Sequence, residues 1–79
     1  MEVSAKKCEY ILGYNIKRIR EKKMKLSQES LAELCGMSVR GYRKIEKCES
    51  SATLESLNKL SEATGFTQIQ LLTEGLVIE

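Results

Sequence analysis

The chain has 79 residues, of which 42% are apolar and only 5% aromatic, and it contains neither tryptophan nor proline. This length leaves room for one domain with one small core, so residues 1–79 are predicted to form a single domain of modest stability. We expect the core to extend over about residues 10–75, with residues 1–8 as a candidate disordered segment.

Charge is distributed unevenly along the chain. The formal net charge is only +2, yet residues 1–50 contain 12 Lys and Arg against 7 Glu, whereas residues 51–79 contain one Lys against four Glu. A basic first half can face nucleic acid, and an acidic second half cannot. The asymmetry therefore says more about binding partners than the net charge does.

Cysteine usage argues against a metal site. Cys8, Cys35 and Cys48 are widely separated, no CxxC pair occurs, and the chain has no histidine, so we predict no metal and no cofactor. Reduced thiols are the simpler interpretation, with Cys35 acting as a small hydrophobic residue. The first residues lack the apolar run of a signal peptide, and no stretch approaches the roughly 18 apolar residues of a membrane span. By elimination, we expect a cytoplasmic protein without a membrane partner.

Catalysis is not expected either. Without histidine and aspartate, general acid–base chemistry would fall to Glu, Lys, Tyr or Cys, and no pair of these residues has a spacing that indicates a shared site. Cys35 would be a nucleophile without a base, and it lies on the apolar face of its predicted helix, where a buried thiol is inert. We therefore predict no catalytic residues and a protein that is not an enzyme.

The first predicted helix extends from about Tyr10 to Lys23. Its apolar residues recur at spacings of four and three, which is typical of an amphipathic helix. These residues are Leu12, Ile16 and Ile19. The opposite face is rich in lysine and arginine, a pattern that is most often a solvated helix face.

The sequence LSQESLAELCGMSVRGYRKIEK, which begins at Leu26, predicts two short helices joined by a tight turn. Ser27 is a good N-cap, because its hydroxyl can accept a hydrogen bond from an unpaired amide of the first turn. Gly36 can end that helix in the left-handed conformation at least steric cost, and Ser38 repeats the start signal. The helices are predicted over residues 28–35 and 39–46, the spacing of a helix-turn-helix.

The outer face of the second of these helices is predicted to be cationic. When Tyr42 and Ile45 point inward, the remaining positions are exposed. They are occupied by Val39, Arg40, Arg43, Lys44 and Lys47. Four basic groups around one small apolar side chain form a surface suited to the major groove of DNA.

A polar connection, Glu49-Ser50-Ser51-Ala52, leads to a fourth predicted helix, which is capped by Thr53 and ended by Gly65. Its apolar face contains Leu54, Leu57 and Leu60. Thr67 and Gln70 then have the spacing of a capping box for a short fifth helix, which we expect Gly75 to end.

Two segments, SQESLAELCGMS and YRKIE, resemble the phage-repressor family of helix-turn-helix domains, the Cro-type regulators, and the likeness covers roughly Leu12 to Leu72. The resemblance implies an all-α fold, a compact five-helix bundle of the lambda-repressor-like type with a central helix-turn-helix. It further implies a sequence-specific transcriptional regulator, a repressor, that binds double-stranded DNA and reads the major groove with the helix at residues 39–46.

The resemblance also assigns roles to individual residues. Val39, Arg40 and Lys44 match the family's base-reading positions. Phosphate contacts are expected from Gln28, Ser38, Arg43 and Lys47, of which the first two lie at helix N-termini, where free amides and a partial positive charge favour anions. An arginine and a glutamate of the family form a structural ion pair, and the matching residues are Arg20 and Glu46.

The chain departs from the family pattern at four places. The segment between Arg20 and Leu26 is one residue longer than usual. Cys48 stands where glycine is common, and Ala52 where proline is common, so a less rigid or differently shaped turn is expected there. Thr64 stands where a bulky apolar residue is common, so packing near the fifth helix should differ.

A second class of function is compatible with the same fold. An antitoxin-type module or another protein-interaction module would keep the five helices without reading DNA, and its partner would be a toxin or another protein. The cationic helix face, the short Val39 and the polar residues at the helix N-termini favour DNA binding. A phage-type repressor, a restriction-modification controller and an antitoxin share these features.

A homodimer is expected, because one recognition helix reads only a few base pairs and two half-sites are needed to select a site. The predicted interface comprises the fifth helix and an apolar tail, with Leu71, Leu72, Leu76, Val77 and Ile78. Apolar side chains left in water forgo the free energy of burial. The alternative is a tail that folds back on the core of its own monomer.

Overall fold

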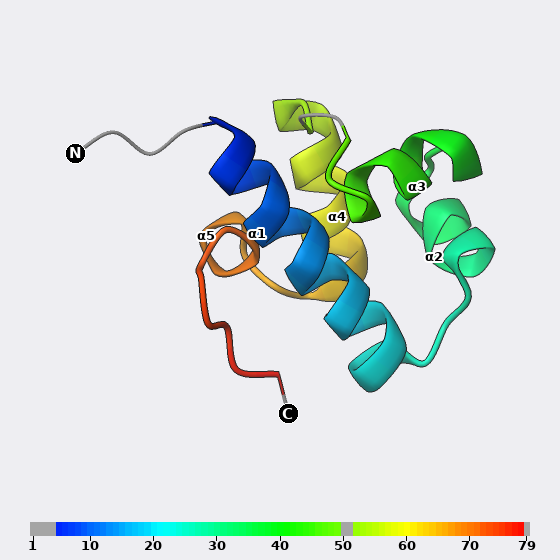
Figure 1. Cartoon of the computed structure of the whole chain (residues 1–79). Coiled ribbons are helices and arrows are strands. Elements are labelled where there is room, and N and C mark those ends of the chain that lie inside the picture. The colour runs from blue at the N-terminus through cyan, green and yellow to red at the C-terminus, as the bar shows by residue number, and fades with distance from the viewer. Residues whose placement is uncertain (1–4, 50–51, 79) are drawn as a thin grey trace.

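The computed structural model describes residues 5–49 and 52–78, with side chains from Tyr10 onward. In this part of the chain the structure is all-helical, without strands (Figure 1). The helices are α1 (Ala5–Arg18), the π-helical segment η1 (Ile19–Met24), α2 (Gln28–Cys35), α3 (Val39–Glu46), α4 (Leu54–Thr64) and α5 (Gln68–Leu71). The all-α fold of five helices with a central helix-turn-helix is therefore confirmed.

The ends of α2 and α3 lie at the predicted residues, because the cap residues have the expected geometry. The hydroxyl of Ser27 accepts a hydrogen bond from the amide of Ser30 at 3.1 Å, and that of Ser38 accepts from Gly41 at 3.0 Å. Gly36 ends α2 with φ at 69°, in the left-handed region that favours glycine.

The start signals of the last two helices are also confirmed. Thr53 caps α4 by accepting from the amide of Ser56, and Gly65 ends that helix with φ at 79°. Thr67 and Gln70 form the complete capping box of α5. Ser50 and Ser51 of the predicted polar connection lie outside the described residues.

Two predicted helix limits are wrong, the start of the first helix and the end of the fifth. The first helix begins at Ala5 rather than near Tyr10, and of the candidate disordered segment only residues 5–8 are described; they are helical. The helical turns continue to Met24 as a π-helix. The fifth helix ends at Leu71, with Leu72 as its C-cap, because the amide of Leu72 already closes the last turn by bonding to Gln68 and Ile69 carbonyls. Gly75, with φ at 77°, lies in a later turn.

The π-helical segment η1 leads from α1 to the turn before α2. A π-helix closes its hydrogen bonds over one more residue than an α-helix does. The amides of Lys25 and Leu26 both bond to the carbonyl of Arg20, and Lys25 turns the chain with φ at 54°. The chain thus turns toward α2 at Lys25, and Ile19 and Arg20 are buried within the π-helical segment.

The core lies where α1, α2, α3, α4 and α5 meet. Tyr42 at its centre has no exposed surface, and Ala32 is equally buried where α2 and α3 cross. The other buried apolar residues are Leu12, Ile16, Ile19, Leu31, Cys35, Ile45, Leu57, Leu60 and Leu71. Thr64 is buried among them and satisfies its hydroxyl by donating to the carbonyl of Leu60 at 2.8 Å. A hydroxyl here therefore replaces the bulky apolar group of the family without an unpaired polar atom.

The C-terminal tail is attached to α1 through polar side chains. Asn15, which is fully buried, donates from Nδ2 to the carbonyls of Leu71 at 2.9 Å and Thr73 at 3.0 Å. Arg18 donates to the carbonyl of Leu76 at 3.1 Å. Leu76 and Ile78 pack against the core of the same chain. The tail therefore follows the fold-back alternative.

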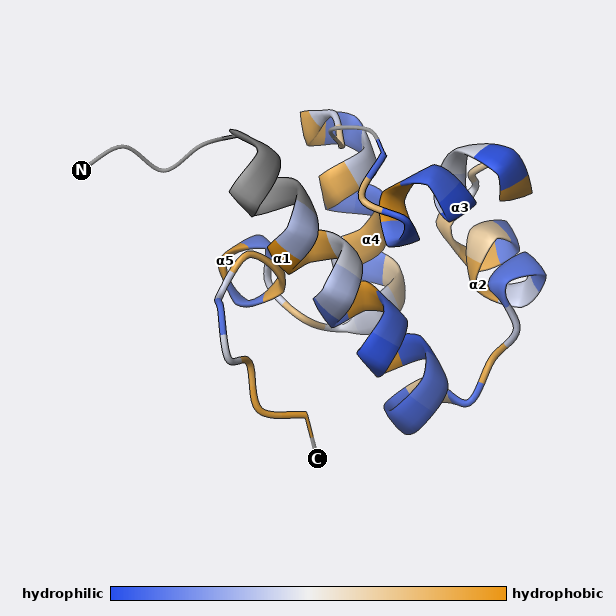
Figure 2. Ribbon diagram, viewed as in Figure 1, coloured by the Kyte–Doolittle hydropathy of each residue, from blue (hydrophilic) through white to orange (hydrophobic). Residues whose placement is uncertain are grey.

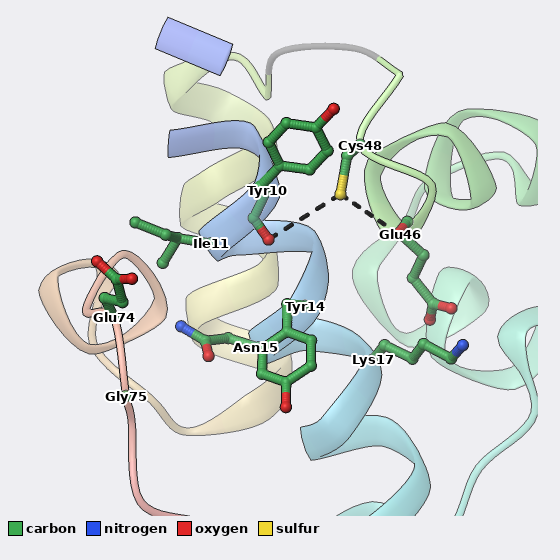
Figure 3. A pocket seen from close by; sticks show the side chains of 9 residues that line it. All are labelled: Tyr10, Ile11, Tyr14, Asn15, Lys17, Glu46, Cys48, Glu74 and Gly75. Atoms are coloured by element: carbon green, nitrogen blue, oxygen red, sulfur yellow. Dashed lines mark hydrogen bonds between the residues drawn. The ribbon is translucent and has the colours of Figure 1, made fainter. Parts of the chain in front are cut away.

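α1 and the end of α3 approach each other closely at Gly13. A Cβ atom at this position would lie 2.5 Å from the carbonyl oxygen of Ile45 and 2.8 Å from Sγ of Cys48. Cys48 itself has φ at 61° and points its thiol toward the carbonyls of Tyr10 and Glu46 (Figure 3). The residue that replaces the family's glycine thus retains the backbone conformation that glycine adopts most easily.

Replacing Gly13 with alanine should lower the free energy of unfolding by roughly 1–3 kcal/mol, because the added methyl group overpacks the contact between α1 and α3. This loss should appear even though alanine raises helix propensity by up to about 1 kcal/mol. Urea unfolding at neutral pH measures the difference.

Gly41→Ala is the matched control, since the same change in α3 would meet only the hydroxyl of Ser38 at 3.0 Å. Its effect should stay within about 1 kcal/mol in either direction. Equal destabilisation by both substitutions would contradict the close approach at Gly13.

Candidate nucleic-acid interface

The helix-turn-helix is held on the core from both sides. α2 packs against α3 and α4, and α3 also packs against α1. In Figure 1, α2 and α3 lie on one side of α1, and α5 with the tail lies on the other. The outer face of α3 is consequently left uncovered, while its inner face is fixed by α1 and α2.

A buried ion pair connects the π-helical segment η1 to α3. Nε of Arg20 donates to Oε2 of Glu46 at 2.6 Å, and Nη2 donates to Oε1 at 3.2 Å, which gives the forked contact that the family resemblance implied. The side chains are 10% and 3% exposed. Nη1 of Arg20 also donates to the carbonyl of Leu26 at 2.9 Å, so the same guanidinium fixes the segment before α2.

The Glu46 carboxylate collects further donors. The hydroxyl of Tyr42 donates to Oε2, and Nε2 of Gln28 donates to Oε1 at 3.0 Å. Among the described residues, every buried side-chain nitrogen or oxygen has a hydrogen-bond partner. Residues from η1, α2 and α3 thus meet at one carboxylate, which sets the orientation of the recognition helix.

The ionisation of these groups follows from the same contacts. Burial by itself would raise the pKa of Glu46, but the hydrogen bonds from Arg20, Tyr42 and Gln28 and the charge of Arg20 outweigh it and lower that pKa below its usual value. Burial, together with the neighbouring carboxylate, raises the pKa of Tyr42. The hydrogen bond to Glu46 raises the pKa of Arg20. The carboxylate is therefore charged and the phenol neutral at physiological pH.

The outer face of α3 is basic and exposed, and it is coloured as hydrophilic in Figure 2. A shallow hollow on this face is lined by Arg40, Arg43, Lys44, Lys47 and Glu49. The structure therefore brings together four of the basic residues that the sequence placed on this surface. Four basic side chains against the single carboxylate of Glu49 leave the hollow with an excess of positive charge, which favours a polyanion such as DNA.

The other predicted DNA contacts differ in their accessibility. Ser38 is exposed at the N-terminus of α3. Val39 is half-buried and packs against the core, so only part of its side chain is available to a base. Gln28 is also half-buried, and its side-chain amide is engaged by Glu46 and Arg43. The side chain of Gln28 is thus a structural bridge in the protein without DNA.

The predicted dimer residues are divided between the core and the surface. Leu71 is fully buried in its own monomer, so its side chain is not available to a partner. Leu76 and Ile78 are half-buried against the same core. Leu72 and Val77 are 39% and 75% exposed. Ile69, which the sequence analysis did not select, is 80% exposed on α5.

Three structurally important residues were missed. Asn15 and Gly13 were not selected, because the backbone atoms that they contact belong to distant segments of the chain. Glu29, at the first turn of α2, forms an ion pair with Arg43 at 3.2 Å. The only signal available for Glu29 was its place in the motif's first helix, because its partner lies 14 residues away in the sequence.

Cys35 and the potential metal ligands give no sign of a further site. Burial raises the pKa of the Cys35 thiol, which keeps it protonated in the core. Within residues 5–49 and 52–78, no three Cys or Glu side chains are grouped so that they could hold a metal ion. None of the described helices has the length and apolar character needed to cross a membrane.

Fold and surface together define a DNA-binding regulator of the helix-turn-helix class. The sequence model of the helix-turn-helix family matches residues 16–72, more than half of the chain, and the protein therefore belongs to this family. The resemblance to Cro-type regulators is thereby confirmed. The crystal structure of the hypothetical transcription factor NHTF from Neisseria is similar, with a TM-score of 0.78 and 27% identity over 92% of this chain and 83% of that chain. No curated protein matches.

The Glu46 network should make stability depend on pH. Because the pKa of Glu46 is lowered by folding, its contribution is complete above its usual value of 4.5 and is lost as the pH falls through the lower folded-state value. Urea unfolding of the wild type and of Glu46→Gln between pH 7 and pH 3 should show a stability difference that shrinks below about pH 4.5.

At pH 7 the variant should be roughly 3–5 kcal/mol less stable, because Arg20 keeps a buried charge without its partner. Glu62→Gln on the exposed side of α4 is the control and should leave the pH profile parallel to that of the wild type. A Glu46→Gln profile that is also parallel would show that the carboxylate does not carry this role.

Proposed function

We propose that the protein is a sequence-specific transcriptional repressor that inserts α3 into the major groove of double-stranded DNA. The observation that carries the proposal is the exposed basic face of α3. The buried hydrogen-bond network at Glu46 fixes the orientation of this helix. A rigid helix with basic side chains at its surface fits the width of the groove and reads base edges there. No step of this function requires catalysis or a cofactor.

In this proposal Arg40, Lys44 and Val39 read bases. Arg40 is exposed near the start of α3 and can bond the two acceptors of a guanine. Lys44, one helical turn later, reaches a neighbouring guanine or a phosphate. The exposed part of Val39 contacts a thymine methyl group, and its packing on the core limits it to a short reach.

Phosphate contacts come from the rim of the same surface. Lys47 and Arg43 extend from the later part of α3, and Ser38 lies where free amides at the helix start attract anions. Because the side chain of Gln28 is engaged within the protein, we assign its phosphate contact to the N-terminal turn of α2 and not to its amide group. These contacts position the motif without reading sequence.

The working species is proposed to be a homodimer that binds two half-sites about one helical turn apart. The exposed residues Ile69, Leu72 and Val77 on α5 and the tail supply an apolar surface on the side of α1 away from the recognition helix (Figure 2). Leu76 and Ile78 are half-buried, and their exposed side-chain atoms belong to the same apolar surface.

Base reading and positioning can be separated by mutation. A preferred duplex is first selected from random-sequence DNA, and affinities for it and for random duplex are then measured by fluorescence anisotropy. Arg40→Ala should cost roughly 1–3 kcal/mol chiefly on the selected duplex, whereas Lys47→Ala should weaken binding to both duplexes about equally.

Lys59→Ala is the matched control, since this lysine lies on α4 in an ion pair with Glu55. It should change neither affinity. Equal losses on both duplexes for Arg40→Ala would refute its role as a base reader. A wild-type protein that selects no duplex would favour the protein-interaction module with the same fold.

The dimer surface is tested without disturbing the monomer core. Val77→Asp places a charge on the exposed apolar surface and should shift sedimentation equilibrium at micromolar concentration from dimer toward monomer, because burying an unpaired carboxylate is costly. Leu54→Asp, at an 82% exposed position at the start of α4, is the control and should leave the association unchanged. Association that is indifferent to Val77→Asp would exclude the tail as the interface.

A further inference from the structure

Arg43 is held along one edge by two residues of α2. Its Nε donates to Oε1 of Gln28 at 3.1 Å, and its Nη2 donates to Oε2 of Glu29 at 3.2 Å. Nε and Nη2 form the side edge of the guanidinium group. The end formed by Nη1 and Nη2 can still bond a phosphate.

The orientation of the Gln28 amide is imposed by the buried network. Its nitrogen donates to the carboxylate of Glu46 at 3.0 Å, so its oxygen has to face the other way, toward Arg43. Arg43 is therefore aligned by the same carboxylate that orients α3. Glu29 then adds a negative charge beside that aligned cation.

The ion pair lies at the surface, where it can exchange partners. The side chains of Arg43 and Glu29 are 48% and 56% exposed, and Arg43 lines the basic hollow on α3. A DNA phosphate that approaches this face has to compete with the Glu29 carboxylate for Arg43. Exposed pairs of this kind correspond to a factor of about two to five in an equilibrium constant.

This competition for Arg43 lowers the affinity of non-specific complexes most. Binding to random DNA rests almost entirely on phosphate charge, so a carboxylate beside the interface opposes the one interaction on which such a complex depends. A specific complex also gains from the base contacts of Arg40 and Lys44, and its fixed register allows Arg43 to use the free end of its guanidinium group. The carboxylate thus lowers non-specific affinity more than specific affinity.

We infer that Glu29 is a specificity-determining residue, which together with Gln28 clamps Arg43 and suppresses binding to random DNA. This inference rests on the proposed function. Glu29 acts through Arg43, so it positions a DNA-contacting group and reads no base itself.

The experiment compares Glu29→Gln with the wild type on the selected duplex and on random duplex over a range of salt concentrations. Affinity for random duplex should rise about two- to five-fold per domain, and affinity for the selected duplex by less. The ratio of the two affinities should fall. The slope of log affinity against log salt on random duplex should steepen by up to about 0.9 per domain, as expected for one additional phosphate contact.

Two controls separate the clamp from a general change of charge. Glu33→Gln makes the same substitution one turn later on the exposed part of α2 and should raise affinity for random duplex less than Glu29→Gln does. In an Arg43→Gln background, Glu29→Gln should have little further effect. Equal effects of Glu29→Gln with and without Arg43, or of the two glutamate substitutions, would overturn the inference.

A measurement on the free protein tests the clamp without DNA. Nitrogen-15 relaxation of the Arg43 side chain should show an ordered Nε–H bond that becomes more mobile in Glu29→Gln, and unchanged mobility would rule the clamp out. If the wild type binds no duplex at all, the proposed function and the specificity role fail together. An ordered Arg43 would then still show that the clamp itself exists.

Discussion

The carboxylate of Glu46 is the point at which three helices are fixed relative to one another. It is almost fully buried, so its charge would be costly to keep unless donors surrounded it. Arg20 of η1, Gln28 of α2 and Tyr42 of α3 provide those donors. Each bond has a direction, and together they restrict how α3 can rotate and tilt on the core. Packing alone, which tolerates small shifts of apolar side chains, would define that orientation less sharply.

This constraint matters because groove recognition depends on small displacements. Side chains that read base edges have to arrive within hydrogen-bond distance from a helix whose backbone is already positioned. The network is placed on the inner side of α3, and its last member, Gln28, reaches the outer side by accepting from Arg43. Hydrogen bonds therefore connect the buried carboxylate of Glu46 to Arg43 on the exposed basic surface. Glu29 binds the same arginine.

The stability that supports this arrangement comes from a small core with several close fits. Gly13 allows α1 to approach the end of α3, and Asn15 attaches α1 to the carbonyls of Leu71, at the end of α5, and of Thr73. Arg20 contacts Glu46 from the π-helical turn at residues 19–24. α1 thus contacts the end of α3 at Gly13 and the segment around the end of α5 at Asn15.

Sequence reasoning succeeded where the determinant was local. Ser27, Ser38, Thr53 and Thr67 define helix starts through bonds to amides three residues away, and a glycine in the left-handed conformation marks each of two ends, so these limits could be read directly.

Features that depend on contacts between residues far apart in the sequence were not predicted. The two bonds of Asn15 span more than fifty residues, and the close contact of Gly13 involves a carbonyl of another helix. The π-helical hydrogen bonds at residues 19–24 were not predicted, because no local sequence pattern marks them. A tail folded back on its own core was one of two alternatives. The contact of Arg18 with the carbonyl of Leu76, which favours this alternative, could not be predicted from the sequence.

The central claim is that the outer face of α3 reads bases in the major groove. Methylation interference tests it most directly, because a methyl group on N7 of guanine lies in that groove and blocks a bidentate arginine. On a duplex selected by the protein, we predict interference at guanines in two half-sites about one helical turn apart, and its loss at one guanine per half-site with Arg40→Ala. Binding that is indifferent to methylated guanines and sensitive only to modified phosphates would contradict the account.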